Sequence, residues 1–212
     1  IWAFLMSYYG AKSWLEELRA AEEFGYDPWI HTASPVRTIQ ELDMAYRDLA
    51  DEVRVRQEVV QEGGGVSVKR TFETPAGRIS DETFSPPPGG DYGVDPSPTK
   101  RSHLIKTPDD LAAMRYILPA PTRASFQSYH AIARAVGQDG FVDMTMNLPL
   151  DHFLGDARGM EQLMMDYYLD RPFFDSMLAL FQDYALEVLK AALEQGVRAI
   201  FGTWYYASLS AG

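Results

Sequence analysis

Residues 53–84, "VRVRQEVVQEGGGVSVKRTFETPAGRISDETF", are the stretch that decides the fold. In the first third, Val53, Val55 and Val59 alternate with arginine and glutamate side chains, which is the period of a strand with one apolar face. After three glycines "VSVKRTFE" alternates again. "TPAG" then has proline at the second and glycine at the fourth position of a turn, and "RISDETF" follows as a third strand. These residues predict an antiparallel insertion.

The chain on both sides of this insertion alternates between strand and helix patterns. Ser13 and Glu16 have capping-box spacing and begin a helix that ends at Gly25. Thr38 and Glu41 repeat that spacing for a second helix. Strand after helix is typical of parallel crossover units, so the fold class is α/β, and periodicity alone leaves an open sheet and a barrel as alternatives. The other strands are predicted at 2–6, 28–32, 140–147 and 197–201, and the other helices at 107–118, 126–136, 160–168 and 172–195.

Composition limits the partners of this protein. The chain has 212 residues and a formal charge of −11, which repels phosphate backbones and anionic lipid surfaces, so we expect no nucleic-acid or membrane partner. It has no cysteine, so it offers neither a disulfide framework nor a sulfur ligand for zinc. Without a long apolar stretch or a secretory signal, it is predicted to be soluble and cytoplasmic.

Three further stretches carry a family resemblance. They are "RTFETPAGRIS" (70–80), "SHLIKTPDDLAAMRYIL" (102–118) and the segment 148–202, in which "G-x-E-x-L-x-x-D-x-x-x-x-P" leads into a long helix, a glycine and a strand. In this order they resemble the uroporphyrinogen decarboxylase superfamily, and within it the corrinoid-linked methyltransferase branch. The resemblance implies a TIM (β/α)8 barrel with its site at the carboxyl ends of the strands.

A TIM barrel needs about 250 residues. We therefore expect residues 1–212 to form one incomplete barrel domain, equivalent to the first half to two thirds of a family member. Within it, residues 53–102 form the hairpin insertion and a proline- and glycine-rich surface segment. Because both ends fall inside apolar runs, we expect the remainder of the barrel to lie outside this sequence.

The resemblance implies an enzyme that moves a methyl group between a small methylated compound and a carrier. The implied carrier is a corrinoid (cobalamin) or a tetrahydrofolate-type pterin, a corrinoid protein is an implied partner, and a homodimer is a further expectation. Family members bind zinc through a His-x-Cys pair and a later cysteine. No such motif occurs here, so zinc ligands are expected only beyond residue 212 and no metal ligand is assigned.

Two groups of aromatic residues argue for a flat ligand. Decarboxylases of the superfamily carry arginines after the first strand to hold a polycarboxylate, but this chain has no arginine before Arg19, which disfavours decarboxylation. Aromatic faces and phenolic hydroxyls suit a flat, weakly polar ligand, although such clusters are also common in cores and interfaces. The candidate binding residues are Ser7, Tyr8, Tyr9, Trp204, Tyr205 and Tyr206.

Four polar residues lie at or just after the ends of predicted strands, where a barrel would present them to its pocket. His31 lies at the end of the second predicted strand, and a hydrogen-bonded structural histidine is the alternative interpretation. Asn147, Asp151 and His152 follow the strand residues "FVDMTM" (141–146), and Asp151 could instead cap the next turn. We predict His31, Asp151 and His152 as catalytic residues and Asn147 as a binding residue. Besides the enzyme, a ligand-binding or assembly domain without catalysis stays an alternative.

Overall fold

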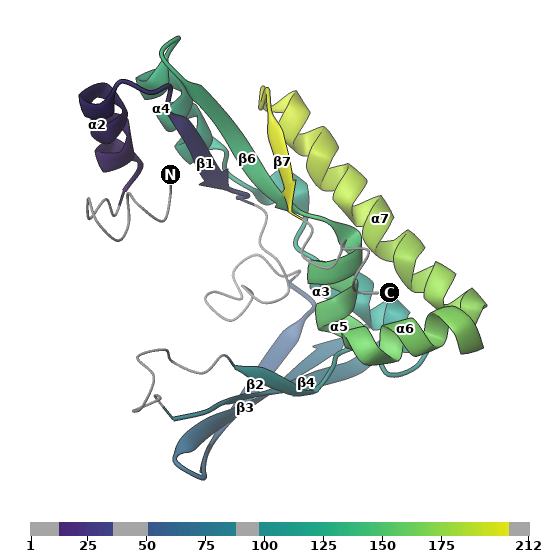
Figure 1. Cartoon of the computed structure of the whole chain (residues 1–212). Helices are drawn as coiled ribbons and strands as arrows, with labels where there is room; N and C mark the ends of the chain where they lie inside the picture. Colours follow the sequence, from purple (N-terminus) through teal and green to yellow (C-terminus); the bar gives the residue numbers. More distant parts are fainter. Residues whose placement is uncertain (1–12, 36–50, 88–97, 204–212) are drawn as a thin grey trace. The chain divides into compact units, whose positions relative to one another are not determined.

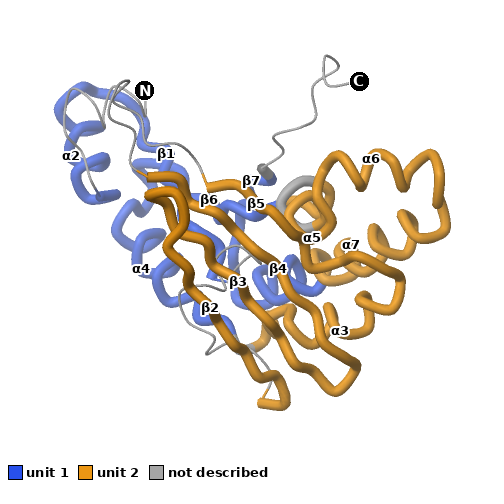
Figure 2. The backbone as a smooth tube through the Cα atoms, turned by 90° about the horizontal axis from the view of Figure 1, so that it is seen from below, with its two compact units in different colours: residues 1–36, 124–147, 187–212 blue, residues 37–123, 148–186 orange. Residues whose placement is uncertain are grey.

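The structure, a computed structural model, describes residues 13–35, 51–87 and 98–203. The chain divides into two compact units, coloured separately in Figure 2. The parallel-sheet unit comprises residues 1–36, 124–147 and 187–212, and the antiparallel-sheet unit comprises residues 37–123 and 148–186. Each unit is described by itself.

The parallel-sheet unit contains three strands in the order β1-β6-β7, with β6 in the middle (Figure 1). They are β1 (Trp29–Ala33), β6 (Phe141–Asn147) and β7 (Ile200–Thr203), and all three run parallel. Because side chains alternate along a strand, Ile30 and Met144 share one face and are almost completely buried. Helix α4 (Gln127–Val136) packs on β6. The predicted strand at 140–147 and the helix at 126–136 are confirmed.

Helix α2 (Trp14–Phe24) begins and ends where its sequence predicts. The Ser13 hydroxyl accepts a hydrogen bond from the Glu16 backbone N–H at 3.4 Å. Gly25 ends the helix in the left-handed conformation, with φ 69°, which only glycine adopts without strain. Trp14 and Leu18 of this helix pack against the buried cluster of Ile30, Ile132 and Val136.

The antiparallel-sheet unit is built on four strands in the order β2-β3-β4-β5. The strands are β2 (Arg54–Glu62), β3 (Gly65–Thr74), β4 (Gly77–Ser85) and β5 (Thr99–Ser102). A two-residue turn at Gly63 and Gly64 joins the first pair, and both glycines have the positive φ that such a turn requires. The three predicted strands are confirmed. The fourth strand, β5, was not predicted. The prediction of an irregular segment is wrong for Thr99–Ser102.

Helices follow the sheet in this unit. They are α3 (Asp110–Ile117), η4 (Pro121–Arg123), the π-helix η5 (Pro149–Gly155), α5 (Asp156–Arg158), α6 (Met160–Leu169) and α7 (Arg171–Glu194), which continues into the other unit. Helix α3 packs on β3 and β4 with Met114 and Ile117 fully buried. None of the described helices has the length and apolar character to cross a bilayer.

Two boundaries differ from the prediction. Helix α3 begins at Asp110, later than predicted, although the Asp110 carboxylate accepts hydrogen bonds from the backbone N–H groups of Lys106 and Thr107, both at 2.7 Å, and the bond from Thr107 is the reciprocal bond of a capping box. The last strand begins at Ile200, because the Val197 N–H still bonds to the Ala192 carbonyl and completes the end of α7. The predicted strand at 2–6 and the helix from Thr38 lie outside the described residues.

The predicted TIM barrel is wrong. A barrel closes only when each strand is hydrogen-bonded on both sides. In the described part of the chain, three parallel strands form an open sheet, and the four antiparallel strands form a separate sheet of their own. The alternation of strand and helix is real, but it produces a small open parallel sheet.

Two buried carboxylates make the antiparallel-sheet unit sensitive to acid. Burial alone would raise the pKa of Asp81, but hydrogen bonds and charge from Arg70 and Lys100 outweigh it and lower that pKa. Asp166 shows the same balance, with hydrogen bonds from Arg158 and Gln162 lowering its pKa. In the unfolded chain both carboxylates regain their ordinary pKa, so the unfolded state binds protons at a higher pH than the folded state.

We therefore expect the free energy of unfolding to be nearly constant at neutral pH and to fall with decreasing pH from about pH 5, near the upper end of carboxylate titration. Urea unfolding measured from pH 7 to pH 3 checks this. The Asp166→Asn variant should show a weaker dependence on pH below pH 5. An equal slope in both proteins would contradict the assignment of acid sensitivity to this carboxylate.

Candidate functional site

One face of the parallel sheet carries a histidine paired with a buried aspartate. Trp29 and His31 are two positions apart on β1, so their side chains lie on the same face of the strand. The strand register sets His31 directly opposite Asp143 of β6. Phe141 is paired with Trp29, and Phe201 is paired with Thr145, which is two positions after Asp143 on β6. Both phenylalanines therefore lie on the same face. We call this surface the His31 face.

The Asp143 carboxylate is held by two donors. Its side chain is 2% exposed, whereas that of His31 is 45% exposed. Nδ1 of His31 lies 3.1 Å from Oδ1 and 3.0 Å from Oδ2 of Asp143, and Nε1 of Trp29 donates to Oδ2 at 2.5 Å. The Thr32 hydroxyl donates to the Asp143 backbone carbonyl at 2.8 Å. The carboxylate is therefore fixed, and it fixes the imidazole in turn.

This arrangement decides which nitrogen of His31 carries the proton in the neutral ring. An ionised carboxylate only accepts hydrogen bonds, so the nitrogen that faces it, Nδ1, must be the donor. The lone pair of neutral His31 is then on Nε2, which has no hydrogen-bond partner among the described residues. An imidazole with this orientation can take a proton from a ligand at Nε2, and Asp143 stabilises the cation that forms.

Aromatic rings surround the histidine. The His31 ring centre lies 4.9 Å from that of Trp29 and 5.1 Å from that of Phe201, and Trp29 contacts Phe141 and Phe201 edge to face. Trp29, Phe141 and Phe201 are between 41% and 52% exposed, so their rings offer apolar surface on the His31 face.

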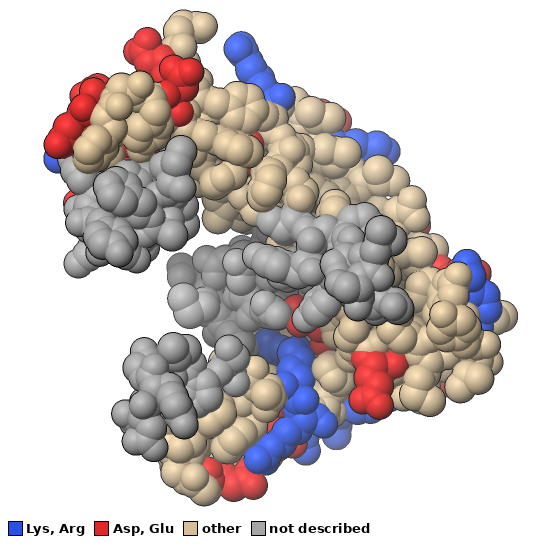
Figure 3. Space-filling view, in the orientation of Figure 1, with Lys and Arg blue, Asp and Glu red and all other residues tan. Residues whose placement is uncertain are grey.

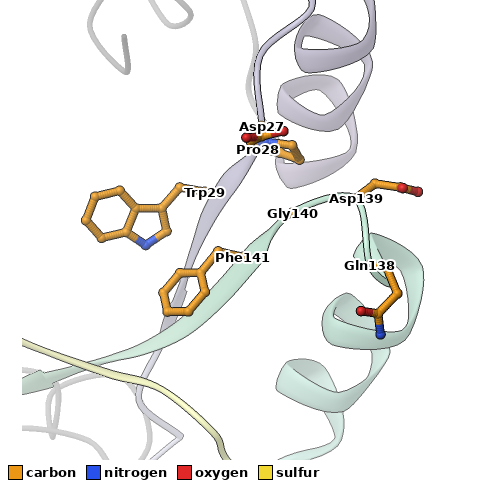
Figure 4. A pocket seen from close by; sticks show the side chains of 7 residues that line it. All are labelled: Asp27, Pro28, Trp29, Gln138, Asp139, Gly140 and Phe141. Carbon is orange, nitrogen blue, oxygen red and sulfur yellow. The ribbon is translucent and has the colours of Figure 1, made fainter.

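A pocket of about 560 Å³ lies at the amino-terminal ends of β1 and β6. Trp29 and Phe141 line it together with the loop residues Gln138 and Asp139, and Figure 4 shows both rings extending to the same side of the two strands. A volume of this order suits a small ligand. The pocket is at the opposite end of the strands from the site that the family resemblance implies.

Helix α2 brings a second ionisable group near this site. Burial raises the pKa of Glu17, and a positive charge on His31 opposes that rise. Burial also raises the pKa of Tyr26, and the negative charge of Glu17 adds to the rise. The Tyr26 hydroxyl is buried without a hydrogen-bond partner in the described part of the chain. A positive charge on His31 therefore favours the ionised form of Glu17.

The other predicted site residues have different outcomes. Asn147 ends β6 on the His31 face, two alternation steps beyond Asp143, and is half-buried. Asp151 and His152 lie in η5, which belongs to the antiparallel-sheet unit, and their side chains are outside the described part of the structure. Six candidates lie outside the described residues: Ser7, Tyr8, Tyr9, Trp204, Tyr205 and Tyr206.

Sequence reasoning missed four members of this site, namely Trp29, Phe141, Asp143 and Phe201. Two features of the sequence could have indicated two of these residues. Asp143 is a charged residue inside the apolar strand "FVDMTM", and Trp29 is two positions before His31, which puts the two side chains on one face of a strand. The pairing of His31 with Asp143 depends on the register of strands that are more than a hundred residues apart.

The described residues give no support for the metal and the carrier that the resemblance implies. No three His, Cys, Asp or Glu side chains gather as a metal site within the described ranges. We therefore derive no step through zinc or a corrinoid.

Comparisons of this chain with protein-family models, with curated proteins and with solved structures find no match. The resemblance to the methyltransferase branch therefore stays a prediction.

Proposed function

We propose that this chain supplies the acid–base group of an enzyme that transfers a methyl group to or from a small, flat substrate. The observation that carries the acid–base role is the hydrogen bond from His31 Nδ1 to the buried Asp143, with the rings of Trp29 and Phe201 against the imidazole. The choice of methyl as the transferred group comes from the family resemblance alone.

Methyl transfer of this kind involves two proton movements, one away from the acceptor and one to the donor atom. A thiol or hydroxyl acceptor becomes a nucleophile when it loses its proton, whereas an amine attacks with its lone pair and loses its proton afterwards. In both cases the bond from the methyl carbon to the donor oxygen or nitrogen breaks. That donor atom keeps the electron pair and takes up a proton. Nε2 of His31 accepts the first proton, and the imidazolium returns it to the leaving atom, while Asp143 stays ionised throughout. Positioned proton transfer of this kind contributes about 10² to 10⁴ in rate.

The rings beside His31 would hold the donor. An aromatic ring stacked against Trp29 or Phe201 places its oxygen substituent near Nε2 without requiring a charged contact. A methoxyphenol has this shape and is the donor that we propose. A polycarboxylate substrate is disfavoured, since this face has no arginine among its described residues.

The first test is demethylation of 2-methoxyphenol by the full chain with tetrahydrofolate as the acceptor, measured as catechol formed. We expect the His31→Gln variant to lose at least about 10² of the wild-type rate. His130→Gln is the matched control, because His130 lies on α4 against Tyr129 and away from the Asp143 carboxylate, and it should keep the wild-type rate.

The alternatives predict different results. Equal rates in the wild type and His31→Gln would contradict the acid–base role. Binding of methoxyphenol to the wild type without product would favour the non-catalytic ligand-binding domain. Carbon dioxide release from a porphyrinogen, with no demethylation, would favour the decarboxylase.

A further inference from the structure

The outer edge of β2 is a surface that the proposed function does not use. Strand β2 pairs with β3 on one side, and no described strand pairs with its other side (Figure 2). Its pairing with β3 continues over all 9 residues without a bulge. Val59 and Val60 point to opposite faces of this strand and are 58% and 56% exposed. A long, regular edge strand with apolar side chains is a template for pairing with another strand.

The turns of this sheet determine which backbone groups of β2 point outward. The two residues that flank a two-residue turn form a hydrogen-bonded pair, and such pairs alternate with non-hydrogen-bonded pairs along the strands. Glu62 and Gly65 flank the first turn, so the even-numbered residues of β2 bond to the odd-numbered residues of β3. Thr74 and Gly77 flank the second turn, which assigns the even-numbered residues of β3 to β4 and so agrees with the first. The outward N–H and C=O groups of β2 are therefore those of Val55, Gln57, Val59 and Gln61.

A second copy of β2 fits this edge best in one antiparallel register. Outward groups pair with outward groups, so the twofold axis must pass through a residue and not between two residues. With the axis at Gln57, Arg56 lies opposite Glu58 of the second copy, and Val55 lies opposite its Val59, and symmetry produces each pair twice. An axis at Arg56 or at Glu58 would place like charges opposite one another. An axis at Val59 would make one pair of valines where the axis at Gln57 makes two.

On one face, this register continues a row of alternating charges. Glu82, Lys69 and Glu58 lie opposite one another on β4, β3 and β2, so the row reaches the edge of the sheet with a carboxylate. Figure 3 shows lysine and arginine side chains over this sheet, with acidic side chains near them. Arg56 of the second copy would be the next member of the row. Arg56 lies 3.7 Å from Glu73 of its own chain but is 73% exposed, so that contact is weak and does not hold the guanidinium in place.

On the other face, the same register joins apolar side chains. Val59 lies opposite Val68 on β3, and Val55 lies opposite Phe72. Pairing about Gln57 would set Val59 beside Val55 of the second copy. The result is one apolar row across both sheets, which removes the exposed Val59 from water.

We propose that the chain forms a symmetric dimer with a second copy of itself, by antiparallel pairing of the two β2 strands about Gln57. The two antiparallel sheets then become one continuous sheet. The proposal is independent of the function proposed for the His31 face. The competing interpretation is that the arginine and glutamate side chains of β2 protect an exposed edge from association.

The first test combines sedimentation velocity with amide hydrogen exchange of the full chain, over about a hundredfold range of protein concentration. We expect an equilibrium between monomer and dimer. As the dimer forms, exchange should slow at the outward amides of Val55, Gln57 and Val59, whereas the amides of Arg56 and Glu58, which bond to β3 in both states, should change little. A chain that stays monomeric, a dimer with unchanged exchange at the outward amides, or outward amides already protected in the monomer would each overturn the proposal.

The second test uses charge reversal. Arg56→Glu and Glu58→Arg each set like charges opposite one another, so each should weaken the dimer at least about tenfold. A mixture of the two variants restores both ion pairs and should form a heterodimer about as tightly as the wild type. Arg134→Glu, which makes the same change in net charge at an exposed position of α4, should dimerise like the wild type. A mixture that stays as weak as its components, or an equal loss in Arg134→Glu, would overturn the register.

A further variant does not depend on charge. Val59→Pro removes an outward N–H, which proline tolerates on an edge strand because that N–H makes no bond within the sheet. We expect this variant to stay folded and to dimerise at least about tenfold more weakly. Wild-type dimerisation of folded Val59→Pro would show that the interface lies elsewhere and would overturn the proposal.

Discussion

Replacement of Asp81 by asparagine is expected to lower the free energy of unfolding by about 3–5 kcal/mol, the range found when one partner of a buried ion pair is removed. The variant keeps the shape of the side chain and removes its charge. Arg70, which is 3% exposed, and Lys100 would then both lose the carboxylate with which they pair. Urea unfolding, together with hydrogen exchange at the amides of β3 and β4, measures the loss.

The matched control is Asp175→Asn. Asp175 pairs with Arg171 at 2.7 Å, but both side chains are more than half exposed, so solvent screens the pair. Its loss should cost less than about 1 kcal/mol. If the two variants were equally destabilised, the buried Arg70–Asp81–Lys100 group would contribute no more to the stability of this sheet than an exposed ion pair does.

The antiparallel sheet could be predicted from sequence because its signal is local. Each of β2, β3 and β4 alternates between two kinds of side chain, and glycine turns separate them. Strand β5 could not be predicted in this way. Its four residues, "TKRS", have no apolar face, and it pairs with β4 across an irregularity between Glu82 and Thr83. Its position depends on the rest of the sheet.

The barrel prediction failed for a related reason. An open parallel sheet and a closed barrel have the same local pattern of strand, helix and strand, so the segments that carry the family resemblance do not distinguish them. Closure depends on how many parallel strands pair and on which edges remain, and neither is encoded in any one segment. The described residues contain three such strands.

Half of the proposed catalytic pair could be predicted. His31 stands out as a histidine at a strand end, but its role depends on Asp143, which is opposite it only because β1 and β6 pair in this register. A shift of one residue would turn Asp143 to the opposite face. The proposed chemistry therefore depends on a tertiary contact that the spacing of residues along the chain does not reveal.

Replacement of Asp143 by asparagine should remove nearly as much activity as the loss of His31, about 10² to 10⁴ in rate. Asparagine has one acceptor oxygen, whereas both Trp29 Nε1 and His31 Nδ1 donate to Asp143. Trp29 can only donate, so it takes the oxygen. The amide NH₂ then faces Nδ1, which must become the acceptor, and the proton moves to Nε2, where neutral His31 can no longer act as a base.

The imidazole ¹⁵N chemical shifts report this change directly, because they distinguish a protonated Nδ1 from a protonated Nε2. We expect the proton on Nδ1 in the wild type and on Nε2 in Asp143→Asn, with the methoxyphenol demethylation rate falling in the same variant. Asp183→Asn, which changes an exposed carboxylate on α7, should change neither quantity. A variant that loses activity while Nδ1 stays protonated would show that Asp143 acts by holding the fold. An unchanged rate with the tautomer reversed would show that His31 Nε2 is not the base.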